Sequence, residues 1–110
     1  MKKILLLTAI SLSTSAFAGN LHTDLQKLDK EIKRLKNELN AVYNKAYAQT
    51  EAKHELDSSQ KAWLKYKELQ CGDFVVADTQ GSPATVSYDL TCQSILYKQR
   101  IALIKEMFNQ

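Results

Sequence analysis

Between residues 21 and 71 the chain contains neither proline nor glycine, and apolar residues recur there at alternating steps of three and four. This spacing places them along one side of an α-helix and is typical of a heptad-like seam. A long first helix is therefore predicted. We favour the interpretation that this seam packs inside the monomer. The alternative is that it joins two copies in a homodimer. The seam consists of Leu25, Leu28, Ile32, Leu35, Leu39, Val42 and Ala46.

A second helix is predicted from about residue 58 to beyond Cys71. Residues 54–60 are expected to form a break or a bend, and Asp57 followed by Gln60 resembles a helix start. The helical spacing that follows predicts one broad buried face. That face consists of Ala62, Trp63, Tyr66 and Leu69, with Phe74, Val75 and Val76 as a continuation or an apolar exit.

A third helix is predicted from about residue 84 or 87 to residue 108. Its apolar residues again recur at steps of four and three. The expected face consists of Tyr97, Ile101, Ile104 and Phe108, extended by Leu96, Leu103 and Met107. The predicted fold class is all-α: a small bundle of three main helices, with a long first helix and a disulfide-stapled helical hairpin.

The first 18 residues have the organisation of a cleavable signal peptide. Lys2 and Lys3 precede a short apolar stretch, and Ala16-Phe17-Ala18 fits the small-x-small cleavage rule. The apolar stretch is much shorter than the roughly 20 residues that a membrane helix needs. We therefore expect a soluble periplasmic or secreted domain over residues 19–110, with no membrane contact after cleavage.

The two cysteines, Cys71 and Cys92, flank the clearest loop of the chain, which contains Gly81-Ser82-Pro83. In an exported chain with two cysteines, only one intramolecular disulfide is possible. A helical hairpin would bring both positions together, whereas a zinc site lacks a nearby histidine. A structural disulfide is predicted, worth roughly 3 kcal/mol.

The segment between the cysteines is acidic. Residues 72–89 contain Asp73, Asp78 and Asp89 but no lysine or arginine. Together with Gly81 and Ser82 these residues form the candidate partner-binding loop, although aspartates in a solvated connector often act only as caps.

No catalytic constellation accompanies these features. His22 and His54 lack a second histidine at metalloprotease spacing, and neither a nucleophile elbow nor a phosphate-binding glycine loop occurs. Loss of Lys2 and Lys3 would lower the formal net charge from +3 to +1, which argues against nucleic-acid binding. We expect no enzyme activity, no cofactor and no metal.

Three blocks of the sequence resemble the LprI-like lysozyme inhibitor family over roughly residues 36–107. The blocks contain Leu39, Asn40 and Tyr43, then Trp63, Tyr66 and Cys71, and finally Cys92 with Arg100 eight residues later. The resemblance implies an exported helical domain, with lysozyme inhibition as the named activity of some members. We interpret Leu39, Asn40, Tyr43, Trp63, Tyr66 and Arg100 as framework residues.

The leading functional hypothesis is an exported binding module that inhibits lysozyme or another cell-wall hydrolase through the acidic loop. Such enzymes use paired carboxylates in a cleft that an inhibitor can block. Two alternatives are a structural protein that self-associates through the first-helix seam and an immunity protein against a periplasmic toxin.

Overall fold

The computed structural model describes the backbone of residues 2–110 and the side chains of residues 22–110. Residues 2–110 contain helices and no strand, which confirms the predicted all-α class. The elements are α1 (Lys2–Gln49), α2 (Lys53–Lys67), the π-helix η1 (Glu68–Phe74), α3 (Val75–Thr79) and α4 (Thr85–Met107). The expected signal peptide, residues 1–18, lies outside the residues whose side chains are described.

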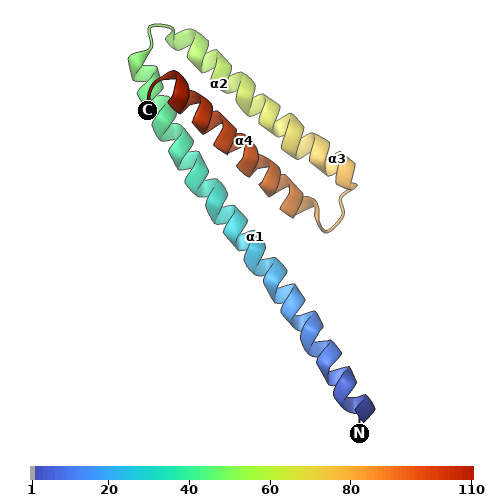
Figure 1. The fold of residues 1–110 in the computed structure, drawn as a ribbon. Coiled ribbons are helices and arrows are strands. Elements are labelled where there is room, and N and C mark those ends of the chain that lie inside the picture. Colours follow the sequence, from blue (N-terminus) through green and yellow to red (C-terminus); the bar gives the residue numbers. More distant parts are fainter. Residues whose placement is uncertain (1) are drawn as a thin grey trace.

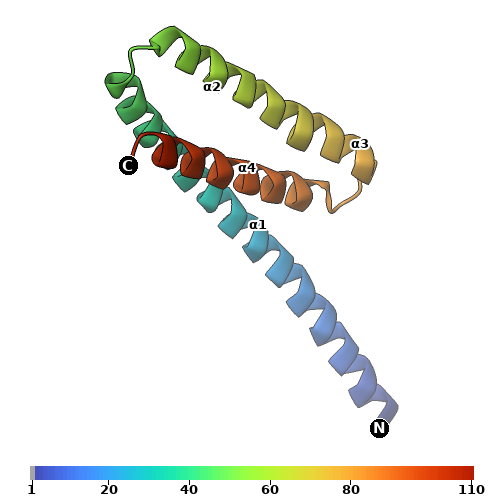
Figure 2. The ribbon, with the colours of Figure 1, turned by 45° about the horizontal axis from the view of Figure 1, so that its top comes forward.

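The helices form three rods rather than five separate pieces. α2, η1 and α3 run on from one another as a single rod, and α4 returns beside it and lies against α1 (Figures 1 and 2). The N-terminal part of α1 extends well beyond the other helices (Figure 1). No helix within the described part of the chain combines the length and apolarity that a membrane span requires.

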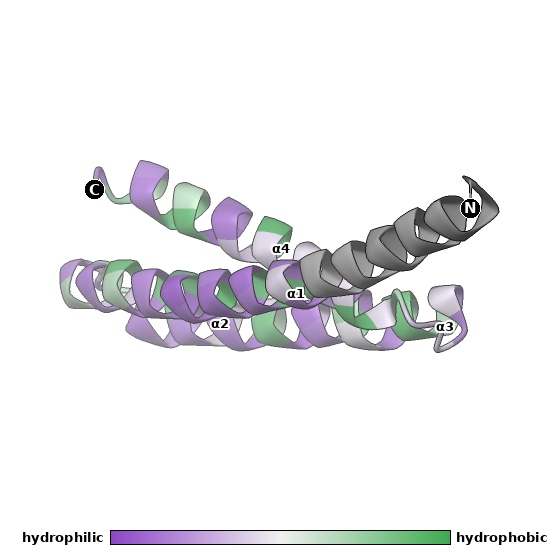
Figure 3. Cartoon of the chain, turned by 90° about the horizontal axis from the view of Figure 1, so that it is seen from below, coloured by the Kyte–Doolittle hydropathy of each residue, from purple (hydrophilic) through white to green (hydrophobic). Residues whose placement is uncertain are grey.

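The core lies between α1 and α4. Five of the seven seam residues of α1 are buried against three residues of α4, so this part of the seam packs inside the monomer, as favoured above. Leu25 and Leu28, nearer the N-terminus, are only half-buried. Figure 3 shows hydrophobic residues interspersed with hydrophilic ones along the helices, as expected when each helix buries only one side. The core residues are Ile32, Leu35, Leu39, Val42 and Ala46 with Tyr97, Ile101 and Ile104.

The break between the first two helices lies earlier than predicted. α1 ends at Gln49 and α2 begins at Lys53, so residues 54–60 are helical rather than bent. Lys53 Nζ donates to the Tyr47 and Thr50 carbonyls, both at 2.7 Å, and thereby satisfies acceptors left open at the end of α1. Asp57 is therefore not a cap. It lies inside α2 and pairs with Lys61 at 3.0 Å.

The predicted aromatic face of α2 is wrong in its extent. α2 has no fully buried residue, and Tyr66 and Leu69 are 50% and 47% exposed. Trp63 is half-buried, with its ring 5.4 Å from the ring of Tyr97 on α4. Trp63 is covered because it packs against α4, whereas Tyr66 and Leu69 stay largely open to solvent and do not line the groove between α1 and α2.

The face predicted for the third helix is correct at its centre and too wide at its end. Leu96, like the core residues of α4, is buried, and Phe108 packs partly against the core. Leu103 and Met107 are instead exposed, because α1 and α2 cover the other sides of α4. The helix itself spans Thr85–Met107, close to the predicted limits.

Candidate functional site

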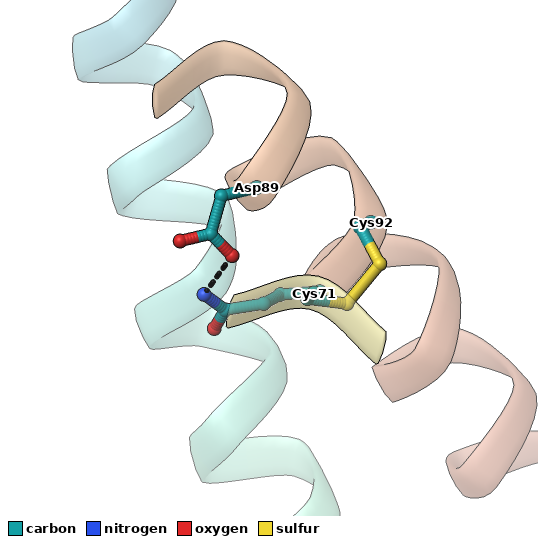
Figure 4. The surroundings of a disulfide bond; sticks show 4 residues. Cys71, Asp89 and Cys92 are labelled. Carbon is teal, nitrogen blue, oxygen red and sulfur yellow. Dashed lines mark hydrogen bonds between the residues drawn. A yellow bond between two sulfur atoms is a disulfide. The ribbon is translucent and has the colours of Figure 1, made fainter. Parts of the chain in front are cut away.

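A disulfide fixes the end of the α3–α4 hairpin. Cys71, in η1, is bonded to Cys92, in α4, across a sequence separation of 21, with their Cα atoms 5.5 Å apart (Figure 4). This confirms the predicted pairing. Closing a loop of this length removes freedom from the unfolded chain and stabilises the fold by roughly 3 kcal/mol. The loop between the cysteines is thereby anchored at both ends.

The chain reverses direction between α3 and α4 through two consecutive left-handed residues. Gln80 has φ 52° and Gly81 has φ 67°, and glycine adopts this conformation without steric cost. The hydroxyl oxygens of Thr79 and Thr85 lie 2.6 Å apart, so a hydrogen bond closes the base of the turn. Gly81 and Ser82 are exposed at its apex, as expected for a protruding loop. We call residues 72–89 the hairpin tip.

The three aspartates of the hairpin tip do not form one cluster. Asp73 and the half-buried Asp89 line the same hollow beside the disulfide, with a volume of about 310 Å3. Asp89 also accepts a hydrogen bond from Gln93 at 2.9 Å (Figure 4). Glu68, from η1, adds a third carboxylate to this hollow. The structure thus brings Asp73 and Asp89 together and places Asp78 elsewhere.

A second hollow, about 390 Å3 in volume, borders Cys92, and Asp78 lines it. Its walls are mainly apolar and include Val75, Tyr88 and Ile95. Tyr88 and Ile95 are 60% and 51% exposed, and because they line the same hollow they form a small contiguous apolar surface of the kind that partners bind. Sequence reasoning missed this surface, although the two residues are seven apart and therefore share one face of α4.

The first block of framework residues lines one wall of the groove between α1 and α2. Leu39 is buried, Asn40 is exposed, and Tyr43 donates a hydrogen bond to Asp57 at 3.3 Å. Burial raises the pKa of the Tyr43 phenol, and the negative charge of Asp57 raises it further. Tyr43 therefore connects α1 to α2 in its neutral form.

Arg100 connects the other pair of helices. It is 9% exposed, and its guanidinium donates to Gln60 Oε1 and Ser59 Oγ on α2, both at 3.0 Å. Burial lowers the pKa of Arg100, but a guanidinium remains protonated at any practical pH. With Trp63 packed on Tyr97 nearby, Arg100 positions α2 against α4. Tyr66, by contrast, is exposed, and its expected framework role stays a prediction.

The described residues contain no group of three or more His, Cys, Asp or Glu side chains placed to hold a metal ion. Fold and surface together define a small helical domain with one disulfide, and the candidate binding surface is the hairpin tip that this disulfide holds in place.

The model of the family described as "Lysozyme inhibitor LprI" matches residues 16–103, and the chain therefore belongs to this family. No curated protein and no solved structure matches the chain.

Proposed function

We propose that this protein is an exported, non-enzymatic inhibitor of lysozyme that binds the enzyme through its hairpin tip. The observation that carries the proposal is the combination of the acidic segment 72–89 with the disulfide that anchors both of its ends. The family description supplies the class of target. The disulfide at both ends of the acidic segment supports the hairpin tip as the binding surface.

Two physical properties favour the hairpin tip as the binding surface. The disulfide restricts the loop before any partner arrives, which reduces the conformational entropy lost on binding. The exposed Asp73 and Asp78, with the half-buried Asp89, form a local negative field that attracts a cationic enzyme and accelerates association. Because no lysine or arginine lies within residues 72–89, nothing in this segment neutralises that field.

The apolar hollow supplies the contact area that charge alone cannot. Tyr88 and Ile95 present large side chains beside the acidic groups, and tyrosine is among the residues that most often dominate binding energy. A contact that begins with electrostatic attraction would be completed by burying these two side chains. The protruding turn at Gly81 and Ser82 would then enter the substrate cleft and block its paired carboxylates.

Export is part of the same proposal. The expected signal peptide over residues 1–18 would direct the chain out of the cytoplasm. A disulfide that anchors a short hairpin is stable in an oxidising compartment and would be reduced in most cytosols. The target enzyme would therefore be met in the periplasm or outside the cell.

The proposal is tested by measuring cell-wall hydrolysis by lysozyme in the presence of purified protein and of two charge-neutralised variants. The first variant replaces the acidic groups of the hairpin tip, Asp73→Asn, Asp78→Asn and Asp89→Asn. We expect it to inhibit at least tenfold more weakly, with a smaller dependence on salt concentration. If this variant inhibits as strongly as the unmodified protein, the hairpin tip is not the binding surface.

The matched control removes as many negative charges at exposed positions elsewhere in the chain: Asp24→Asn, Glu51→Gln and Glu55→Gln. This variant has the same net charge as the first. We expect it to inhibit like the unmodified protein. Equal losses in both variants would indicate that net charge, rather than the hairpin tip, determines binding.

A further inference from the structure

A groove between α1 and α2, on a different part of the molecule from the hairpin tip, has the features of a second binding site. Its volume is about 490 Å3, within the range of roughly 300–1,000 Å3 that ligand sites occupy. We call it the interhelix groove. It is lined by Lys36, Leu39, Asn40, Tyr43, Asp57, Gln60, Lys61, Leu64, Lys67 and Tyr97.

The interhelix groove carries an excess of positive charge. Three lysines line it, against the single carboxylate of Asp57. That carboxylate already accepts hydrogen bonds from Tyr43 at 3.3 Å and pairs with Lys61 at 3.0 Å. The positive charges of Lys36 and Lys67 are therefore left for a ligand, because no ion pair between either lysine and a described residue is present.

Lys67 is the most informative of these lysines. It is half-buried, its Nζ lies 3.0 Å from the Tyr97 hydroxyl, and the same Nζ is 4.9 Å and 6.0 Å from the ring centroids of Tyr97 and Trp63. Lys105, the other half-buried lysine with a described side chain, pairs with Glu38 at 3.0 Å. Lys67 has no such carboxylate, although an ammonium has three donors to satisfy.

The remaining walls indicate what kind of anion would fit. Leu64, which is 41% exposed, offers aliphatic contact. The side-chain amides of Asn40 and Gln60 offer hydrogen-bonding groups, and the Gln60 oxygen already accepts from Arg100. Amide side chains of this kind match the hydrogen-bonding groups of a peptide backbone. No arginine lines the groove, whereas bidentate recognition of phosphate favours arginine. Lysine, a point charge, suits a carboxylate equally well.

We propose that the interhelix groove binds an acidic peptide segment, with one carboxylate on Lys67 and another on Lys36. A leucine-like side chain of the peptide would cover the exposed Leu64, and its backbone would pair with Asn40 and Gln60. No residue of the hairpin tip lines this groove, so the two sites are distinct, although Lys67 also borders the hollow that contains Asp73 and Asp89.

The test uses the purified chain and two acetylated, amidated tetrapeptides as probes, one alternating leucine with glutamate and the other alternating leucine with glutamine. Isothermal titration calorimetry at low and high salt gives both affinities. We expect the glutamate peptide to bind at least tenfold more tightly at low salt, and this difference to shrink at high salt. Equal affinities, or no detectable binding of the glutamate peptide at millimolar concentration, would overturn the proposal.

Variants locate the site. Lys67→Gln keeps a donor for Tyr97 but removes the charge, and it should weaken the glutamate peptide at least tenfold. Lys65→Gln is the control on the same helix, outside the groove, and should have no effect. Thermal melting of each variant verifies folding. If Lys67→Gln fails to fold, the exposed Lys36→Gln and its control on α1, Lys45→Gln, decide the question in the same way. Equal losses in a groove variant and its control would overturn the assignment.

Discussion

Replacing Arg100 by methionine removes two of the hydrogen bonds that attach α2 to α4 while keeping an unbranched side chain in the same space. In the native fold the guanidinium reaches two neutral partners on α2, Gln60 and Ser59, each at 3.0 Å. α2 has no fully buried residue of its own. Its position therefore depends on a few specific contacts, and we expect this substitution to loosen α2, whereas η1 stays attached to α4 by the Cys71–Cys92 disulfide.

The magnitude follows from two opposing effects. Each hydrogen bond from a charged donor contributes about 1.5–3 kcal/mol, and both are lost. The variant also no longer buries a charge, which returns part of that free energy. We expect a net destabilisation of about 2 kcal/mol, which for a domain of this size lowers the melting temperature by roughly 8–16 °C. Urea unfolding followed by the fluorescence of Trp63, which packs beside Tyr97, measures the loss.

The matched control is Arg34→Met on α1. Arg34 is exposed and pairs with Glu31 and Glu38 at 3.7 and 3.1 Å. Exposed ion pairs contribute about 0–1 kcal/mol, so this variant should unfold almost like the unmodified protein. An Arg100→Met variant that is as stable as the Arg34→Met variant, or more stable than the unmodified protein, would refute the view that Arg100 positions α2.

Three further predictions concern the staple, the core and the response to acid. A Cys71→Ser, Cys92→Ser double variant should lose roughly 3 kcal/mol of stability and become sensitive to proteases at the hairpin tip, as limited proteolysis would reveal. Leu35→Ala should cost about 2–5 kcal/mol in denaturant unfolding, because Leu35 is only 2% exposed. The pKa of Glu38 is lowered, first by the hydrogen bond from Lys105, so its stabilising contribution is present above the ordinary value of 4.5 and disappears as the pH falls below it. The unmodified protein should therefore lose more stability between about pH 5 and pH 3 than Glu38→Gln does.

Each of these predictions has a control and a contradicting result. For the staple, the unmodified protein under reducing conditions should resemble the double variant, and equal protease resistance in all samples would contradict the prediction. For the core, Leu103→Ala alters a leucine that is 48% exposed and should change stability little. Equal losses at both leucines would contradict the described core. For the acid response, parallel pH profiles of Glu38→Gln and the unmodified protein would contradict the assigned pKa.

Local periodicity was sufficient to predict the elements that pack against each other. The seam from Ile32 to Ala46 and the face around Tyr97 and Ile101 are amphipathic patterns, and each is satisfied by the other in the core. The disulfide could be predicted because a chain with two cysteines has a single intramolecular pairing. The family could be recognised because its three blocks keep their order along the chain.

Features that depend on how helices are placed in space could not be predicted. Asp57 followed by Gln60 resembles a helix start, but the break between α1 and α2 lies before Lys53. There the Lys53 ammonium donates to backbone carbonyls at the end of α1, and no sequence motif marks such a contact. The exposure of Tyr66 and the interhelix groove both depend on how α2 is placed against its neighbours. No periodicity within one helix encodes that placement, and hence neither the groove nor the position of Lys67 in it could be predicted from the sequence.

The candidate site likewise combines features that the sequence predicts with features that depend on how the helices are placed. The acidic composition of residues 72–89 is a property of the sequence, and so is the turn at Gly81. The separation of Asp78 from Asp73 and Asp89 depends on which side of the disulfide each helix turn faces. The apolar hollow around Tyr88 likewise exists only once α3 lies beside α4.

The most direct test of the central claim is the rate of cell-wall hydrolysis by lysozyme, measured with increasing amounts of the purified, oxidised protein. Chicken-type, goose-type and invertebrate-type enzymes should each be assayed, because the family description names lysozyme without specifying a type. We predict that at least one of them loses activity in proportion to the protein added, and regains it when the Cys71–Cys92 disulfide is reduced. Full activity of all three enzymes at a large molar excess of the protein would contradict the account.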